Sequence, residues 1–286
     1  LFTLKGSNGQ YRLAMSASAS LPFLYLTDAN KPSPLTAPNF CMLLRKHIAN
    51  GRIVEISQPH MERIINFKIE HLDEMGDLCQ KTLIVELMGK RSNIIFCDAN
   101  GRIIDSIKHV SAAMSSLREV LPGRTYCIPA TQDDRLNPLE VTEETFWDSA
   151  MTKPLPIAKA LYTSFTGVSP VVANEICHRA SIDGDMSVDS LTPDAKKHLY
   201  HNFAWLMEDV KEHRYEPNII TRGREPVEFS CFRLTEYVGS DDAVEATNST
   251  VATDSAGNAG FAGADANESE YTMQHFSSIS AVLEQY

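Results

Sequence analysis

The stretch from Leu83 to Phe96, LIVELMGKRSNIIF, constrains the fold of this chain more than any other. Two aliphatic and β-branched runs, Leu83–Val85 and Ile94–Phe96, lie on either side of a polar turn, Gly89–Asn93. This pattern predicts two rigid strands that hold a basic turn in one place. An ordinary solvated β-turn has the same local sequence, so the rest of the chain must decide between the two interpretations.

Strand-like segments on both sides extend this hairpin. The runs RIVEIS and ERIINFKI lie within Arg52–Leu72 and meet at Gln58-Pro59-His60. Asn100-Gly101 is a strong hairpin signal, and the strand-like run RIIDSIKHV follows it. We therefore expect an antiparallel meander of roughly five strands over residues 52–110, with further strands in Phe2–Thr27.

One amphipathic helix is expected before this meander. Apolar residues recur at helical spacing from Phe40 to Ile48, and Asn50-Gly51 supplies a stop signal. The opposite side of the helix carries Arg45 and Lys46. The sequence thus predicts a helix with a basic outer side.

The pattern changes after Asp133, where a helical block interrupts the strands. Helical periodicity covers Pro138–Ala150, Ile157–Arg179 and Pro193–Glu212. Strand-like runs then return at 218–220, 227–232 and 234–238. The prediction is an α+β fold with an antiparallel, sandwich-like β lobe.

Three regions follow from this order of elements. Residues 1–150 form the first part of the β-rich lobe, 151–214 a helical domain, and 215–286 a return to the lobe. Residues 239–270 hold almost no large apolar side chains and are expected to be a disordered loop. The amphipathic tail Phe276–Tyr286 reads as the start of a longer helix.

Charge and cysteine content set limits on the function. The formal net charge is −11, but seven acidic residues and no Lys or Arg lie in 240–270, which leaves a value near −4 elsewhere. Local basic clusters for nucleic acid are therefore still compatible with the composition. The six cysteines show no CxxC spacing, and no apolar run approaches ~20 residues. No signal peptide is visible either. We therefore expect a cytoplasmic protein without a membrane span.

A short turn inside the helical block has its own signature. Gly167, Val168, Ser169 and Pro170 separate two helical patterns, as in a helix-hairpin-helix. Gly167 permits a tight turn, and Pro170 suits the first turn of the second helix, whose amino end would then face a phosphate. An ordinary helix–turn–helix packing unit fits the same residues, and Ser169 replaces a second Gly that is common in DNA-binding versions.

The local sequence shows no catalytic or metal centre. His198 and His201 stand one helical turn apart, but no third ligand is near in sequence, so we expect a solvated helix face. No Ser-His-Asp or Cys-His arrangement is suggested. We expect a binding module that is not an enzyme and that needs no cofactor.

Several segments carry a resemblance over essentially the whole chain, in the same order. They are Asn39–His47, Glu62–Ile64, Leu83–Asn93, Ile104–Val110, Val120–Arg124, Asp133–Pro138 and Phe276–Ser280. Together they resemble the NFACT-N family, also called the fibronectin-binding protein A N-terminal family, and within it the RqcH-like factors of bacterial ribosome-associated quality control. The resemblance implies a lobe similar to the formamidopyrimidine-DNA glycosylase N-terminal domain, interrupted by a helix-hairpin-helix domain and without glycosylase activity.

The resemblance also implies partners. The chain would be a module that binds tRNA and the large ribosomal subunit carrying a stalled peptidyl-tRNA. With alanyl-tRNA it would support alanine tailing of the stalled chain. The older family name implies an alternative, a cell-surface adhesin that binds fibronectin or fibrinogen.

Candidate tRNA-binding residues are carried over by position from the family motifs. The family's Asp-Arg pair falls on Glu62 and Arg63, with Glu in place of Asp. Its Glu-Ile-Met element and the run that follows fall on consecutive residues: Glu86, Leu87, Met88, Gly89, Lys90, Arg91, Ser92 and Asn93. The helix with Arg45 and Lys46 is a further candidate for an RNA-facing basic surface.

Overall fold

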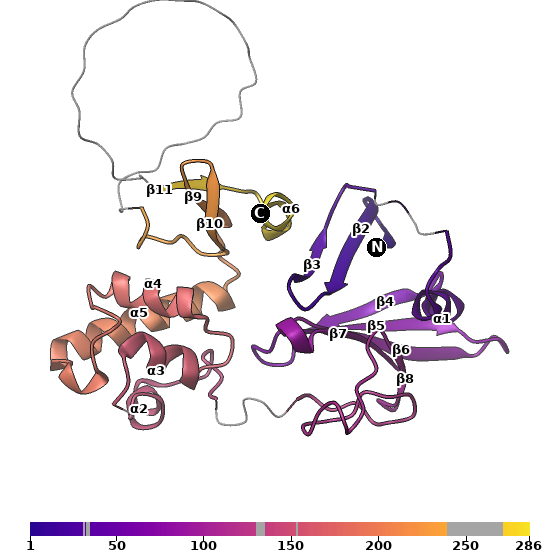
Figure 1. Ribbon diagram of the computed structural model, residues 1–286, viewed down its shortest axis with the longest axis horizontal. Coiled ribbons are helices and arrows are strands. Elements are labelled where there is room, and N and C mark those ends of the chain that lie inside the picture. Colours follow the sequence, from indigo (N-terminus) through magenta and orange to yellow (C-terminus); the bar gives the residue numbers. More distant parts are fainter. Residues whose placement is uncertain (31, 33–34, 130–134, 153, 239–270) are drawn as a thin grey trace, which may run out of the picture. The chain divides into compact units, whose positions relative to one another are not determined.

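The structure is a computed structural model that describes residues 1–286 except 31, 33–34, 130–134, 153 and 239–270 (Figure 1). The chain divides into two compact units. One comprises Leu1–Ala173 and Asp185–Leu191, and the other comprises Asn174–Gly184 and Thr192–Tyr286. Helices and antiparallel sheets occur together, which confirms the α+β prediction.

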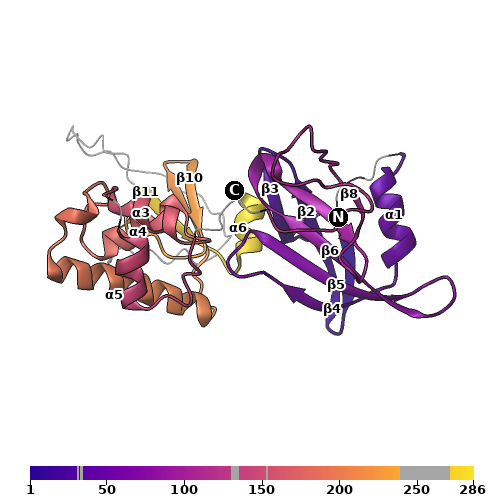
Figure 2. The same ribbon diagram turned by 90° about the horizontal axis from the view of Figure 1, so that it is seen from below.

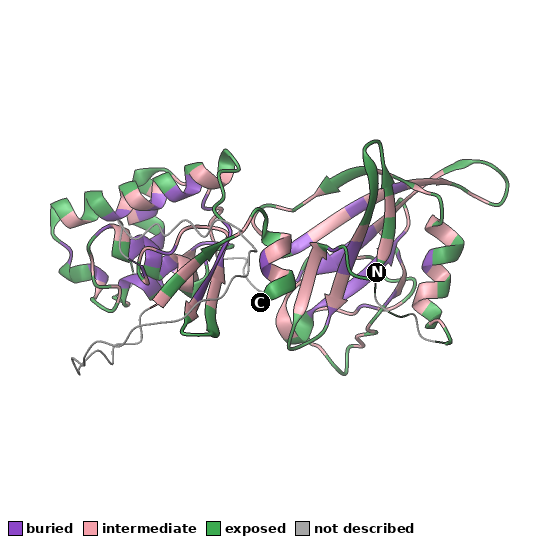
Figure 3. Cartoon of the chain, turned by 90° about the horizontal axis from the view of Figure 1, so that it is seen from above, coloured by how far each residue is buried: buried purple, intermediate pink, exposed green. Residues whose placement is uncertain are grey.

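A five-stranded antiparallel sheet in the order β4-β5-β6-β7-β8 is the centre of the first unit. Its strands are β4 (Arg52–Ser57), β5 (Ile64–Leu72), β6 (Leu78–Glu86), β7 (Asn93–Cys97) and β8 (Ile103–Ser106). The meander predicted over 52–110 is therefore confirmed. Figure 3 shows buried residues along these strands and exposed ones in the hairpin that joins β5 to β6.

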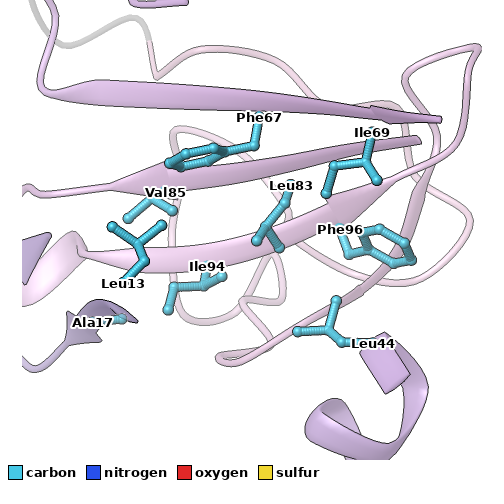
Figure 4. Packing of buried hydrophobic residues seen from close by; sticks show 9 residues of the cluster. All are labelled: Leu13, Ala17, Leu44, Phe67, Ile69, Leu83, Val85, Ile94 and Phe96. Carbon is cyan, nitrogen blue, oxygen red and sulfur yellow. The ribbon is translucent and has the colours of Figure 1, made fainter. Parts of the chain in front are cut away.

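One face of this sheet is covered by a smaller sheet and a helix. The strands β1 (Phe2–Gly6), β2 (Gly9–Ala17) and β3 (Pro22–Leu26) form a three-stranded antiparallel sheet with β2 in the centre, and α1 spans Asn39–Ile48. Side chains from β2, α1, β5, β6 and β7 share one hydrophobic cluster (Figure 4). Its members are Leu13, Ala17, Leu44, Phe67, Ile69, Leu83, Val85, Ile94 and Phe96.

The opposite face of the sheet packs against the segment that follows β8. The alternate residues of the same strands, including Ile84 and Ile95, join Val120 in a second cluster. A bridge between Val110 and Val120 closes this segment against itself. Because side chains alternate across a strand, both faces of the sheet are apolar, as a sheet covered on both sides requires.

The outer strands of the larger sheet do not run in perfect register. The pairing of β4 with β5 shifts between Ile53 and Glu55, and that of β7 with β8 shifts between Phe96 and Cys97. The inner pairings, β5 with β6 and β6 with β7, run without a shift.

Helices occupy the middle of the chain, as the periodicity predicts. They are α2 (Glu143–Thr145) with a π-helical turn at Phe146–Ala150, α3 (Ile157–Ser164), α4 (Pro170–Arg179) and α5 (Pro193–Lys211). Phe146 and Phe165 are fully buried, and their rings stack at 5.5 Å between centroids.

The second unit holds a three-stranded sheet of its own, in the order β10-β9-β11. Its elements are β9 (Asn218–Arg222), β10 (Glu225–Ser230) and β11 (Tyr271–His275), and α6 (Ile279–Gln285) follows. The prediction of a strand at 234–238 is wrong, because these residues form a turn. The third strand of the sheet is β11 instead.

Other expectations about this region stay open. The loop expected at 239–270 lies outside the described residues. The division at residues 150 and 214 and the return of 215–286 to the first lobe stay predictions.

Candidate nucleic-acid interface

The antiparallel register brings the carried-over motifs to one end of the five-stranded sheet. Ile64 at the start of β5 pairs with Glu86 at the end of β6, and Glu86 pairs with Asn93 at the start of β7. Just beyond this row, the amide of Leu87 donates to the carbonyl of Arg63 at 2.8 Å. Two motifs that are more than twenty positions apart in the sequence are thus neighbours in space.

Three cations at this sheet end reach solvent. Arg63, Lys90 and Arg91 are exposed, whereas Glu62 is half-buried. Leu87, Met88 and Gly89 are also half-buried. Arg63, Lys90 and Arg91 together form the cationic sheet end.

The turn that carries two of these cations is held from within. Gly89–Arg91 form one turn of 3-10 helix, and Gly89 has φ +56°, in the left-handed region that favours glycine. The buried Ser92 accepts a hydrogen bond from the Met88 amide at 2.8 Å through its Oγ. Its own amide donates to the Gly89 carbonyl at 3.0 Å.

Asn93 fixes the same turn to the segment that follows β8. Its buried side-chain Nδ2 donates to the Lys108 carbonyl at 2.9 Å, and its Oδ1 accepts from the Lys108 amide at 3.1 Å. Lys108 therefore lies beside the turn as a further basic residue. Sequence reasoning missed it, because the segment after β8 gives no sign of the strand end to which it returns.

Glu86 is fully buried and makes two strong hydrogen bonds. Arg118 Nη2 donates to its Oε2 at 2.5 Å, and Tyr126 Oη donates to its Oε1 at 3.0 Å. The Arg118 guanidinium also donates to the Cys127 carbonyl at 2.6 Å and lies 5.5 Å from the Tyr126 ring centroid. Burial and the Glu86 carboxylate raise the pKa of Tyr126, so the phenol stays protonated and acts as a donor.

This arrangement changes the roles expected of three residues. The side chains of Glu86, Ser92 and Asn93 do not face solvent and instead hold the turn that presents Lys90 and Arg91. A buried carboxylate is tolerated because Arg118 neutralises it and Tyr126 completes its hydrogen bonds. Their part in tRNA binding stays a prediction.

The helix α1 does not share this end of the sheet. It leads into β4, whose first residue Arg52 pairs with Glu70 near the far end of β5. Lys46 accordingly forms an ion pair of 3.2 Å with Glu74, in the hairpin that joins β5 to β6, while Arg45 is exposed. Both views show α1 at that end (Figures 1 and 2). The nine residues of β5 place the two ends roughly 27 Å apart, so Arg45 and Lys46 belong to a separate surface.

The predicted turn between α3 and α4 is present. Gly167 has φ +80°, Val168 is buried, and Pro170 is the first residue of α4. The hydroxyl of Ser169 accepts from the Val172 amide at 3.2 Å. This cap, together with the missing N–H of Pro170, leaves fewer backbone donors for a phosphate than an uncapped helix end offers.

The described residues offer neither a cluster of metal ligands nor a membrane-spanning helix. In that part of the chain, no group of three or more His, Cys, Asp and Glu side chains is arranged to hold a metal ion. No helix there is long and apolar enough to cross a membrane.

The comparisons with known proteins agree with this arrangement. The family model described as NFACT N-terminal and middle domains matches residues 1–254. The chain belongs to the NFACT family. The Rqc2 homolog RqcH of Bacillus subtilis (strain 168) is 38% identical over 241 residues, 84% of this chain and 40% of that protein. The archaeal Rqc2 homolog aRqcH of Methanocaldococcus jannaschii is 27% identical over 221 residues, 76% of this chain and 31% of that protein.

Solved structures of two bacterial proteins share the fold of this chain. The fibrinogen binding protein from Staphylococcus aureus gives a TM-score of 0.71 at 25% identity, over 99% of this chain and 85% of that one. The N-terminal part of the fibronectin/fibrinogen-binding protein from Streptococcus suis gives 0.68 at 27% identity, with the same coverage. The NFACT chain described here spans 40% of the length of the B. subtilis relative.

Proposed function

We propose that this NFACT chain is the N-terminal tRNA- and large-ribosomal-subunit-binding module of an RqcH-like factor in ribosome-associated quality control. The observation that carries the proposal is the cationic sheet end. Arg63 comes from one motif and Lys90 and Arg91 from another, and all three are exposed. The turn that carries Lys90 and Arg91 is fixed by Ser92 and Asn93.

The chemistry of this surface suits an RNA backbone. Arg63 and Arg91 offer planar, bidentate donors to phosphate, and Lys90 offers a point charge. Because the turn is braced, binding does not have to order it first. In a complex with tRNA we expect these cations to meet phosphates, while shape and contacts to unpaired bases supply selectivity.

Finer features of the proposal follow the family resemblance. The preferred ligand is alanyl-tRNA, and the site of action is a large subunit with a stalled peptidyl-tRNA in the cytoplasm. The chain acts by binding, without catalysis of its own. The α3–α4 turn is a helix-hairpin-helix, and the β lobe is similar to the formamidopyrimidine-DNA glycosylase N-terminal domain.

The test measures the Kd for tRNA across a salt series, with both the 286-residue chain and the full-length protein. The test variant replaces Arg63, Lys90 and Arg91 by Ala. Each phosphate contact contributes about 0.7–0.9 to the slope of log K against log salt. Three contacts therefore correspond to about 2 units of slope and a loss of about 100-fold near 0.15 M salt.

Two control variants locate the surface. Lys5→Ala with Arg224→Ala removes two exposed cations that lie outside the cationic sheet end and is expected to leave the salt slope unchanged. Arg45→Ala with Lys46→Ala removes an equal charge at the far end of the sheet. A wild-type salt slope and Kd in the triple variant would refute the proposal. A loss of tRNA affinity in the Arg45 and Lys46 variant alone would show that the tRNA-binding surface lies on α1 instead.

A second candidate function comes from the two solved relatives described above, whose names refer to fibrinogen or fibronectin binding. The alternative proposal is a cell-surface adhesin. Cell fractionation tests it directly. A protein found mainly on the cell surface, with submicromolar binding to fibronectin, would favour the adhesin over the ribosomal role.

A further inference from the structure

The helix α5 presents one large aromatic side chain to solvent. Trp205 is 66% exposed, which is unusual for a residue that normally buries most of its ring. The opposite side of the helix is anchored by four buried side chains: Leu199, Phe203, Leu206 and Met207. The helix therefore does not need Trp205 for its packing.

A second ring lies next to this tryptophan. His201 is one helical turn before Trp205, and the two rings stack with an interplanar angle of 24° and centroids 6.1 Å apart. Residues at i and i+4 share one side of a helix, so the helix itself holds the pair together. The two rings form a flat aromatic surface before any ligand arrives.

The charged groups around the ring pair include a cation that could bind a phosphate. Lys197 is exposed one turn before His201 on the same side of the helix. On the other side, Glu208 and Asp209 are the acids nearest to Trp205 in the helix. They are already paired, Glu208 with Lys211 at 3.8 Å and Asp209 with Arg214 at 2.9 Å. The exposed Asp194 lies one turn before Lys197, so an anion beside Lys197 meets one carboxylate together with the cation.

The surroundings of Trp205 fit a base better than a protein helix. A docking helix needs an apolar stripe or groove. Among the described residues of α5, Trp205 is the only large hydrophobic side chain that is exposed. The stacking of an unpaired base needs only one accessible ring face and a nearby cation for the backbone.

We propose that Trp205, with His201 stacked beside it, is a stacking platform for one unpaired base of an RNA strand whose phosphate contacts Lys197. The inference rests on the proposed function, because it takes RNA as the partner. It adds a second contact surface, on an element that carries none of the family motifs. Base stacking on an exposed ring predicts about 5- to 150-fold weaker binding when the ring is removed.

Tryptophan fluorescence reports this contact directly. The chain has two tryptophans, so Trp147→Phe leaves Trp205 as the sole emitter. Titration of the full-length Trp147→Phe protein with deacylated tRNA is expected to quench the Trp205 emission. Binding of labelled tRNA to Trp205 variants in the native background gives an independent measurement that does not depend on the Trp147 substitution.

The variants separate stacking from simple apolar contact. Trp205→Phe keeps a flat ring and is expected to retain binding within about 5-fold. Trp205→Leu keeps apolar volume without a ring, and we expect its affinity for tRNA to be as low as that of Trp205→Ala. Lys197→Ala is expected to lower the salt slope by about 0.7.

Each other result overturns the inference. Wild-type affinity in Trp205→Ala, together with the expected loss in the triple variant of the cationic sheet end, would refute the platform and leave the proposed function standing. Wild-type affinity in Trp205→Leu with loss in Trp205→Ala would identify an apolar contact instead. No tRNA binding by the wild-type full-length protein would overturn both proposals.

Discussion

The buried ion pair between Glu86 and Arg118 makes the sharpest prediction about stability. The side chain of Glu86 has no exposed area and that of Arg118 has 10%. The substitution Arg118→Ala removes the guanidinium, its bond to the Cys127 carbonyl and its contact with the Tyr126 ring. Glu86 then keeps only the phenol of Tyr126 as a donor.

The magnitude follows from what is left behind. Removal of one partner from a buried pair costs about 3–5 kcal/mol, because the remaining charge stays uncompensated. The chain provides a matched control in Arg124, which pairs with Glu119 at 2.9 Å while its side chain is 62% exposed. We expect Arg124→Ala to cost less than about 1 kcal/mol. The double variant Arg118→Ala with Glu86→Gln should recover part of the loss, since no buried charge remains.

Urea unfolding followed by circular dichroism gives the free energy of unfolding for each variant. Near-UV signals from the first unit should be used as well, because a chain with two units need not unfold in one transition. A cost for Arg118→Ala no larger than that for Arg124→Ala would refute the reasoning. Equal stability of Arg118→Ala with and without Glu86→Gln would show that the carboxylate is not the cause.

Two further predictions concern titration. Burial raises the pKa of Cys97 and of Cys177 to about 12. In the native protein at pH 8, iodoacetamide should therefore modify the exposed Cys127 and leave Cys97 and Cys177 unmodified. Peptide mass spectrometry measures the modification of each cysteine. Burial, and then Lys81, lower the pKa of His47 below 6.5, so the unfolded state binds the proton more tightly. The free energy of unfolding should therefore fall as the pH drops below about 6.5. Urea unfolding between pH 7.5 and 5.5 measures this fall, and His47→Gln should make it smaller. An equally steep fall in His47→Gln would contradict His47 as its origin.

Much of the first unit could be predicted because its signals are local. Alternating apolar residues define each strand, and turn residues define the connections. Asn100-Gly101 is an example, since Gly101 has φ +74° in the connection before β8. The neighbourhood of Glu62-Arg63 and Leu87–Asn93 also follows from the register once the meander is accepted.

The supporting contacts of the site gave no such signal. Arg118 and Tyr126 come 32 and 40 positions after Glu86, in a segment without regular periodicity. The sequence marks Glu86 as a charged residue at a strand end, where exposure is the ordinary expectation. Only the path of the later segment across the sheet shows that the carboxylate is buried and neutralised.

The strand mistake near the C-terminus has a similar cause. Leu234 and Val238 are buried, which produces an apolar pattern. The residues between them are bound to α4 instead, since Thr235 Oγ1 and the Glu236 amide both donate to the buried Glu175 carboxylate. The true third strand, β11, pairs with β9 across about fifty positions of sequence, beyond the range of local patterns.

The shifted register of the outer strands has a consequence for how other chains meet this sheet. Val54 on β4 and Ile104 on β8 are the extra residues at the two shifts, and such bulges bend and twist the strands that carry them. A bent edge is a poor template for an incoming strand, which protects against edge-to-edge polymerisation during synthesis and crowding. Each of the two outer strands of the five-stranded sheet carries one such bulge.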